Sequence, residues 1–166
     1  EAKASEMEYA LKNEIHVRLD QDPAYFASLR QRLEEIIADR KAKRIDAAEQ
    51  LRLYDQVKSQ MEGRGSEAEA VGLSSTGFAI YGLLRDSARP SYGAKVDESK
   101  VALAGALEDT LEPHVGIVDW VHKDDVQREM RRLIKRQLKA ARLDDARAER
   151  LAEELVELMK RRRTPG

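Results

Sequence analysis

Residues 124–142 read DDVQREMRRLIKRQLKAAR, and this stretch decides the class of fold. Its apolar side chains recur at three- and four-residue spacing, which is the repeat of a helix with one buried face. They are Val126, Met130, Leu133, Ile134 and Leu138. Asp124 or Asp125 is the expected cap, because a carboxylate accepts from the free N–H groups of a helix start. The stretch therefore predicts an amphipathic helix with a buried side.

The same period runs through most of the remaining chain. It predicts helices at 5–19, 22–40, 46–61, 75–85 and 97–113, and a last one that begins at Asp144 or Asp145. Three glycines at 63–72, and Pro90 with Gly93 at 88–94, predict loops between them. We expect an all-α fold, with about six to seven helices in one bundle-like domain over residues 1–166.

Composition agrees with this fold class. Just over half of the 166 residues are Ala, Leu, Glu, Lys or Arg, whereas Val, Ile and Thr are scarce, so a sandwich or a sizeable sheet is not expected. There is no cysteine, which excludes disulfide scaffolds and cysteine-ligated zinc. No apolar run approaches about 18 residues, and the first residues are charged, so neither a membrane span nor a signal peptide is expected. We expect a cytoplasmic protein that does not meet a membrane.

The net charge of −1 hides an uneven distribution of charge. Residues 1–122 hold 16 basic and 22 acidic side chains, whereas 123–166 hold 14 and 9. The basic part consists of the two predicted C-terminal helices, 123–163. On the first of them, cations line the polar side at helical spacing: Arg128, Arg131, Arg132, Lys135, Arg136, Lys139 and Arg142. The chain is therefore an acidic body with a basic C-terminal quarter.

Two interpretations of this basic row stay open. It is either a contact for the DNA backbone, which binds rows of Arg and Lys without reading sequence, or a solvated face paired with acids of the last helix. The acids expected for that pairing are Glu153, Glu154 and Glu157. The two interpretations differ in whether the cations share one exposed face or are paired inside the domain.

Trp120 is the one tryptophan and lies just before the basic helix. A buried tryptophan usually anchors a packing junction, here between the helices that flank it. An exposed tryptophan is a frequent hot spot in protein interfaces. The sequence allows both roles, as a packing anchor or as a partner contact.

The sequence holds no motif for catalysis or for metal binding. The histidines His16, His114 and His122 lack the ligand spacing of a zinc site. Neighbouring carboxylates such as Glu34-Glu35 point to different faces of a helix. There is no P-loop, dinucleotide fingerprint or nucleophile elbow. We therefore expect no catalytic, cofactor-binding or metal-binding residue in this chain.

Three blocks of the sequence carry a resemblance to a known family. They are YALKNEIHVRLD at 9–20 with Asp22-Pro23 and residues 29–37, GFAIYGLL at 77–84, and VDW at 118–120 with the basic helix at 126–136. In this order they resemble the C-terminal helical region of the R subunit of type I restriction-modification enzymes. The resemblance runs from about Ser5 to Leu138, and its first block is the most specific.

The resemblance implies a C-terminal fragment of a larger multidomain restriction subunit, which agrees with a first residue, Glu1, that is not methionine. In that family the parent is an ATP-dependent DNA translocase and endonuclease, so ATP and Mg²⁺ are expected in its absent motor and nuclease domains. The region after the motor docks the R subunit onto the methyltransferase and specificity subunits. The expected function is therefore docking by a fragment that does not itself catalyse.

Two alternatives to docking remain. The first is contact with the DNA backbone through the basic helix. The second is a scaffold that packs only on its own motor lobes, where the acidic excess of residues 1–122 complements a basic motor surface.

Overall fold

The computed structural model describes residues 2–85 and 95–163, and it confirms the all-α class. The described residues form eight α-helices, one short 3-10 helix and no strand. The number of α-helices exceeds by one the upper end of the predicted six to seven. In chain order they are α1 (Ala2–Arg18), α2 (Pro23–Lys41), α3 (Ala47–Glu62), α4 (Arg64–Ala70), α5 (Ser75–Leu84), α6 (Glu98–Val115), η1 (Trp120–His122), α7 (Asp124–Ala140) and α8 (Asp145–Arg163). The loop expected at 88–94 lies outside the described residues.

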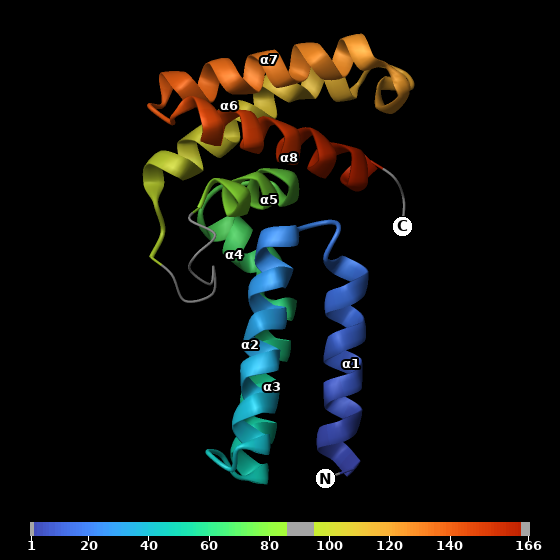
Figure 1. Ribbon diagram of the computed structural model, residues 1–166, viewed down its shortest axis with the longest axis vertical. Helices are drawn as coiled ribbons and strands as arrows, with labels where there is room; N and C mark the ends of the chain where they lie inside the picture. Colours follow the sequence, from blue (N-terminus) through green and yellow to red (C-terminus); the bar gives the residue numbers. More distant parts are fainter. Residues whose placement is uncertain (1, 86–94, 164–166) are drawn as a thin grey trace.

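Two groups of helices make up the shape of the molecule. In Figure 1, α1, α2 and α3 run along the long axis, whereas α6, α7 and α8 lie across its upper end. Helix α5 joins the two groups, because it packs against α2 on one side and against α6 and α8 on the other. The basic C-terminal helices α7 and α8 therefore lie at the end of the molecule opposite the N-terminus.

The central place of α5 follows from its sequence. A helix that is apolar on all sides must be covered on all sides, and Phe78, Ala79, Ile80, Tyr81 and Leu84 are all buried. Its glycines are poor helix formers. At Gly82, however, a Cβ would lie 3.0 Å from the Cβ of Ala24. The glycine therefore allows α2 and α5 to approach closely.

Several helix starts agree with the sequence. The side chains of Asp22, Asp46 and Asp97 accept hydrogen bonds from the backbone N–H groups of the first turns of α2, α3 and α6. Asp144 does the same for α8, with 2.7 Å between its Oδ1 and the N of Arg147. Each of these carboxylates satisfies a backbone donor that the helix itself leaves free.

The prediction of a loop at 63–72 is wrong, because residues 64–70 form helix α4. Gly63 ends α3 by donating to the carbonyl of Ser59, but its own backbone is right-handed helical, so the chain continues into a new helix. The side chain of Arg64 is buried by contacts from distant helices, which override the low helix propensity of the flanking glycines. The chain turns away only at Gly72, where φ is +77°.

Two other expected boundaries are also wrong. Helix α6 continues past Pro113 to Val115, and Gly116 ends it. Proline removes one N–H donor and with it one helix hydrogen bond, yet the helix runs on for two more residues. At the start of α7 the cap position is Lys123, so Asp124 and Asp125 lie inside the first turn, without a side-chain cap bond. At this position their negative charges interact favourably with the positive end of the helix dipole.

Candidate docking and nucleic-acid surfaces

Six of the seven cations in the predicted basic row lie together, and Arg142 does not line the same groove. The six line one shallow groove of about 570 Å³ between α7 and the start of α8, with two acids from α8 among them. The lining residues are Arg128, Arg131, Arg132, Lys135, Arg136, Lys139, Asp145 and Glu149. The six cations form two rows, which differ in their partners.

The inner row consists of Arg131, Lys135 and Lys139, and each member pairs with an acid of α8. The nitrogen to oxygen distances are 2.8 Å for Arg131–Glu153, 3.9 Å for Lys135–Glu149 and 3.4 Å for Lys139–Asp145. From one ion pair to the next, the residue number rises by four on α7 and falls by four on α8. Two antiparallel helices require this order. The inner row therefore joins the two C-terminal helices.

The acids of this pairing are only partly those expected. Glu153 does pair with α7, but Glu157 pairs with Lys160 and Glu154 with Arg150, both within α8. The register of the two helices, which the short 141–144 connection sets, selects Asp145 and Glu149 instead.

The outer row consists of Arg128, Arg132 and Arg136, and all three are exposed. The guanidinium of Arg132 donates two hydrogen bonds to Glu129, of 2.9 and 2.6 Å, and these bonds lower the pKa of the Glu129 carboxyl. Arg128 and Arg136 make no ion pair with the residues that the structure describes. The outer row is thus the part of the basic helix that remains open to an anion.

Trp120 is fully buried, with an exposed fraction of 0%. It lies in η1, which packs against α7, and Gln127 of α7 donates to the carbonyls of Trp120 and Val121 at 3.2 and 2.8 Å. The backbone of Asp119 just before it is left-handed, with φ of 57°, a conformation that Asp tolerates. These contacts favour the role of packing anchor for the connection between α6 and α7.

A polar network that the sequence analysis missed joins the two groups of helices. Its centre is the ion pair between Asp22 and Arg64, with 2.6 Å from Oδ2 to Nε and both side chains buried. Arg64 also donates to the hydroxyl and the carbonyl of Ser75, each at 3.0 Å. Its guanidinium lies 5.1 Å from the ring centre of Phe78. One side chain of α4 thereby holds the start of α2 and the start of α5.

Arg162 extends this network to α8. It donates to the carbonyl of Gln21, to Thr76 at 3.1 Å and to Ser75 at 2.8 Å. Burial raises the pKa of the Asp22 carboxyl, and the charges of Arg64 and Arg162 oppose that rise. Burial also lowers the pKa of the Arg162 guanidinium. The corner between α1 and α2 is thus fixed to α4, α5 and α8.

Helix α1 has apolar side chains on two faces. Leu11 and Ile15 are buried in the core, whereas Tyr9 and Val17 are 75% and 64% exposed. At 100° per residue, the exposed pair lies on the side of the helix opposite to the buried pair. Single exposed apolar residues are common, but here two of the five large exposed apolar side chains that the structure shows share one face of one helix.

The described residues hold neither a metal-type cluster nor a membrane helix. In residues 2–85 and 95–163, no three His, Asp or Glu side chains meet as metal ligands would. Within the same ranges no helix combines the length and the apolar composition of a membrane span.

The fold and its surfaces define an all-α domain whose helices are tied by buried and interhelical ion pairs. The chain matches, over residues 2–163, the family model described as type I restriction enzyme HindI endonuclease subunit-like, C-terminal. Because the match spans almost the whole chain, the chain belongs to this family, and the resemblance seen in the sequence is confirmed. No curated protein and no solved structure matches the chain.

Proposed function

We propose that this domain docks the endonuclease subunit of a type I restriction enzyme onto the methyltransferase and specificity subunits. The family supports this, since it is the C-terminal part of such an endonuclease subunit. The observation that carries the proposal is the second apolar face of α1. Tyr9 and Val17 project from the side that the core does not use, and large apolar side chains in that position favour a protein partner.

The shape of the domain suits this role. The α1–α3 group extends away from the helices at the other end (Figure 1), and α1 offers its outer side along its length. The network of Asp22, Arg64 and Arg162 holds the α1–α2 corner, so α1 keeps a fixed orientation to α5 and α8. A rigid surface loses less conformational entropy on binding than a flexible one.

In this proposal the domain supplies binding and no chemistry. We assign ATP, Mg²⁺ and the cleavage reaction to the motor and nuclease domains of the parent subunit, and cytoplasmic assembly to the whole complex.

Size-exclusion chromatography of the domain with the purified methyltransferase complex tests this function. We expect the domain to elute with the complex and to compete with full-length endonuclease subunit for it. Separate elution of the domain, under conditions where the full-length subunit co-elutes, contradicts docking. The scaffold alternative, packing on the motor lobes alone, predicts that same separate elution.

A second candidate function, contact with the DNA backbone, is favoured by the outer row of α7. Arg128 and Arg136 are exposed and four residues apart, and they make no ion pair with the described residues. Changing both to Gln tests this function without disturbing the α7–α8 pairing. If the row binds phosphates, the slope of log affinity against log salt becomes shallower by about 2. Equal slopes for the variant and the parent protein rule this function out.

A further inference from the structure

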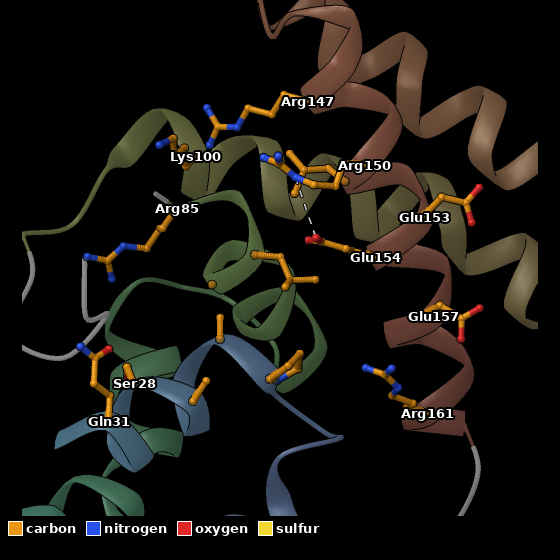
Figure 2. A pocket seen from close by; sticks show the side chains of 16 residues that line it. Ser28, Gln31, Arg85, Lys100, Arg147, Arg150, Glu153, Glu154, Glu157 and Arg161 are labelled. Atoms are coloured by element: carbon orange, nitrogen blue, oxygen red, sulfur yellow. Dashed lines mark ion pairs between the residues drawn. The ribbon is translucent and has the colours of Figure 1, made fainter. Parts of the chain in front are cut away.

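A groove between α8 and the pair α2 and α5 holds a group of cations at one end. Its volume is about 920 Å³, and it is open to solvent. Lys100 of α6 and Arg147 and Arg150 of α8 line it, and Figure 2 shows these three side chains gathered at the end nearest the start of α8. We call them the groove cations. Neither the docking face of α1 nor the outer row of α7 includes them.

Two hydrogen bonds place the groove cations at the C-terminal end of α5. Arg147 donates to the carbonyl of Leu84, with 3.1 Å between nitrogen and oxygen. The backbone N–H of Asp97 donates to the hydroxyl of Tyr81 at 3.0 Å, and Lys100 follows Asp97 by one helical turn. Helices α6 and α8 therefore meet the same end of α5, which brings Lys100 and Arg147 together.

The groove cations have no close carboxylate among the described residues. The Nζ of Lys100 lies 3.8 Å from Asp97, and the Nε of Arg150 lies 4.0 Å from Glu154, both beyond hydrogen-bond distance. Arg147 makes no ion pair with the part of the chain that the structure describes. Its bond to a neutral carbonyl uses one of the five N–H donors of a guanidinium. Three cations and two loosely held carboxylates leave this corner positive.

The surroundings of the groove cations favour an anion. Lys100 and Arg147 are half-buried, and Leu83 and Leu151 line the same groove. A cation that loses water in this way is stabilised when an anion or another acceptor replaces that water. Apolar neighbours also lower the local dielectric constant, which strengthens the attraction between opposite charges. Arg150 is exposed, so it can meet an anion that enters from solvent.

A phosphoryl group matches the groove cations better than a carboxylate does. It carries a charge of about −1.5 to −2 at pH 7 and three acceptor oxygens, one for each cation, whereas a carboxylate has one charge and two oxygens. Guanidinium groups also bind phosphate through two parallel N–H bonds. A nucleic-acid strand that continued along α8 would next meet Glu154, one turn after Arg150 on the same wall (Figure 2). The corner therefore favours a single phosphoryl group.

We propose that the groove cations bind the phosphoryl group of a small molecule, either inorganic phosphate or a mononucleotide. Arg147 and Lys100 hold the group at the end of α5, and Arg150 closes over it from α8. The site does not depend on the proposed docking function, because its residues are separate from the outer face of α1.

Equilibrium dialysis of the chain against radiolabelled inorganic phosphate, in chloride buffer of constant ionic strength, tests the site. Arg147→Gln/Arg150→Gln removes two charges from the groove, and Arg30→Gln/Lys58→Gln removes two from exposed positions outside it as a matched control. We expect the first pair to raise the Kd for phosphate at least tenfold and the control pair less than twofold. Equal Kd values overturn the inference, and so does the absence of binding by the unaltered chain at millimolar phosphate.

The same dialysis with adenosine monophosphate and with a duplex oligonucleotide identifies the source of the phosphoryl group. A tenfold loss for both inorganic phosphate and the mononucleotide supports a phosphorylated small molecule, and a loss for phosphate alone supports the free ion. A loss confined to the oligonucleotide overturns the inference, because the groove cations would then belong to a nucleic-acid surface.

A second variant keeps the test valid if the loss of the bond between Arg147 and Leu84 disturbs folding. Lys100 pairs only at 3.8 Å, so Lys100→Gln removes its charge with little effect on packing. Circular dichroism confirms that the variant is folded. We expect its Kd for phosphate to rise severalfold. An unchanged Kd for the folded variant overturns the inference.

Discussion

Arg64 and Asp22 form a buried ion pair, in which 2.6 Å separates Nε from Oδ2. The two residues are 42 positions apart in the sequence. Their contact joins the start of α2 to the short helix α4. The carboxylate has a second role, because its other oxygen accepts from the N–H of Tyr25 at 3.2 Å. One aspartate thus caps a helix and neutralises a buried arginine.

Removing this arginine is expected to destabilise the domain strongly. Arg64→Met leaves Asp22 buried without its partner, and such a loss lowers the free energy of unfolding by about 3–5 kcal/mol. Urea denaturation followed by circular dichroism measures the change. The control is Arg52→Met, which removes an exposed pair with Glu49 and should leave the urea midpoint nearly unchanged. Similar midpoints for both variants would show that the network does not hold the corner.

Much of the fold could be predicted from local signals. Asp22-Pro23 marks a helix start by a cap and a fixed φ, and the structure has both. Helix α4 could not be predicted in this way, because glycines flank Arg64 and its stability comes from Asp22 and Ser75, which are distant in sequence. Long-range contacts of this kind leave no periodic pattern in the sequence.

The pairing of α7 with α8 should show as a coupling between opposite charges. Lys135→Glu alone brings two acids together, and we expect the free energy of unfolding to fall by about 0.5–1 kcal/mol. Adding Glu149→Lys restores an opposite pair in reversed order and should recover most of that loss. A double-mutant cycle in urea, at low and at high salt, measures the coupling. Additive effects in the cycle would mean that the two side chains do not interact.

The same pairing explains what the sequence could and could not say about the basic helix. Composition and spacing grouped seven cations in one row, and six of them line one groove in the structure. They could not separate the inner row from the outer row. That division depends on which side of α7 meets α8, and both Arg131 and Arg132 satisfy the same spacing rule.

Trp120 is expected to report on packing and not on docking. Because it is fully buried and is the one tryptophan, its emission should be blue-shifted and poorly quenched by acrylamide. Trp120→Ala should lower the free energy of unfolding by about 3–5 kcal/mol, since it leaves a large cavity. Addition of the methyltransferase complex should leave acrylamide quenching unchanged. A clear change in quenching on complex formation would place Trp120 in the interface.

In the proposed function, the domain docks through the outer face of α1. The most direct test is the Kd between full-length endonuclease subunit and the methyltransferase complex, measured for Tyr9→Asp/Val17→Asp and for Lys12→Asp, an exposed change on the same helix. We expect at least tenfold weaker binding for the double variant and less than a threefold change for the control. Equal Kd values for the two proteins, with both folded, would contradict it.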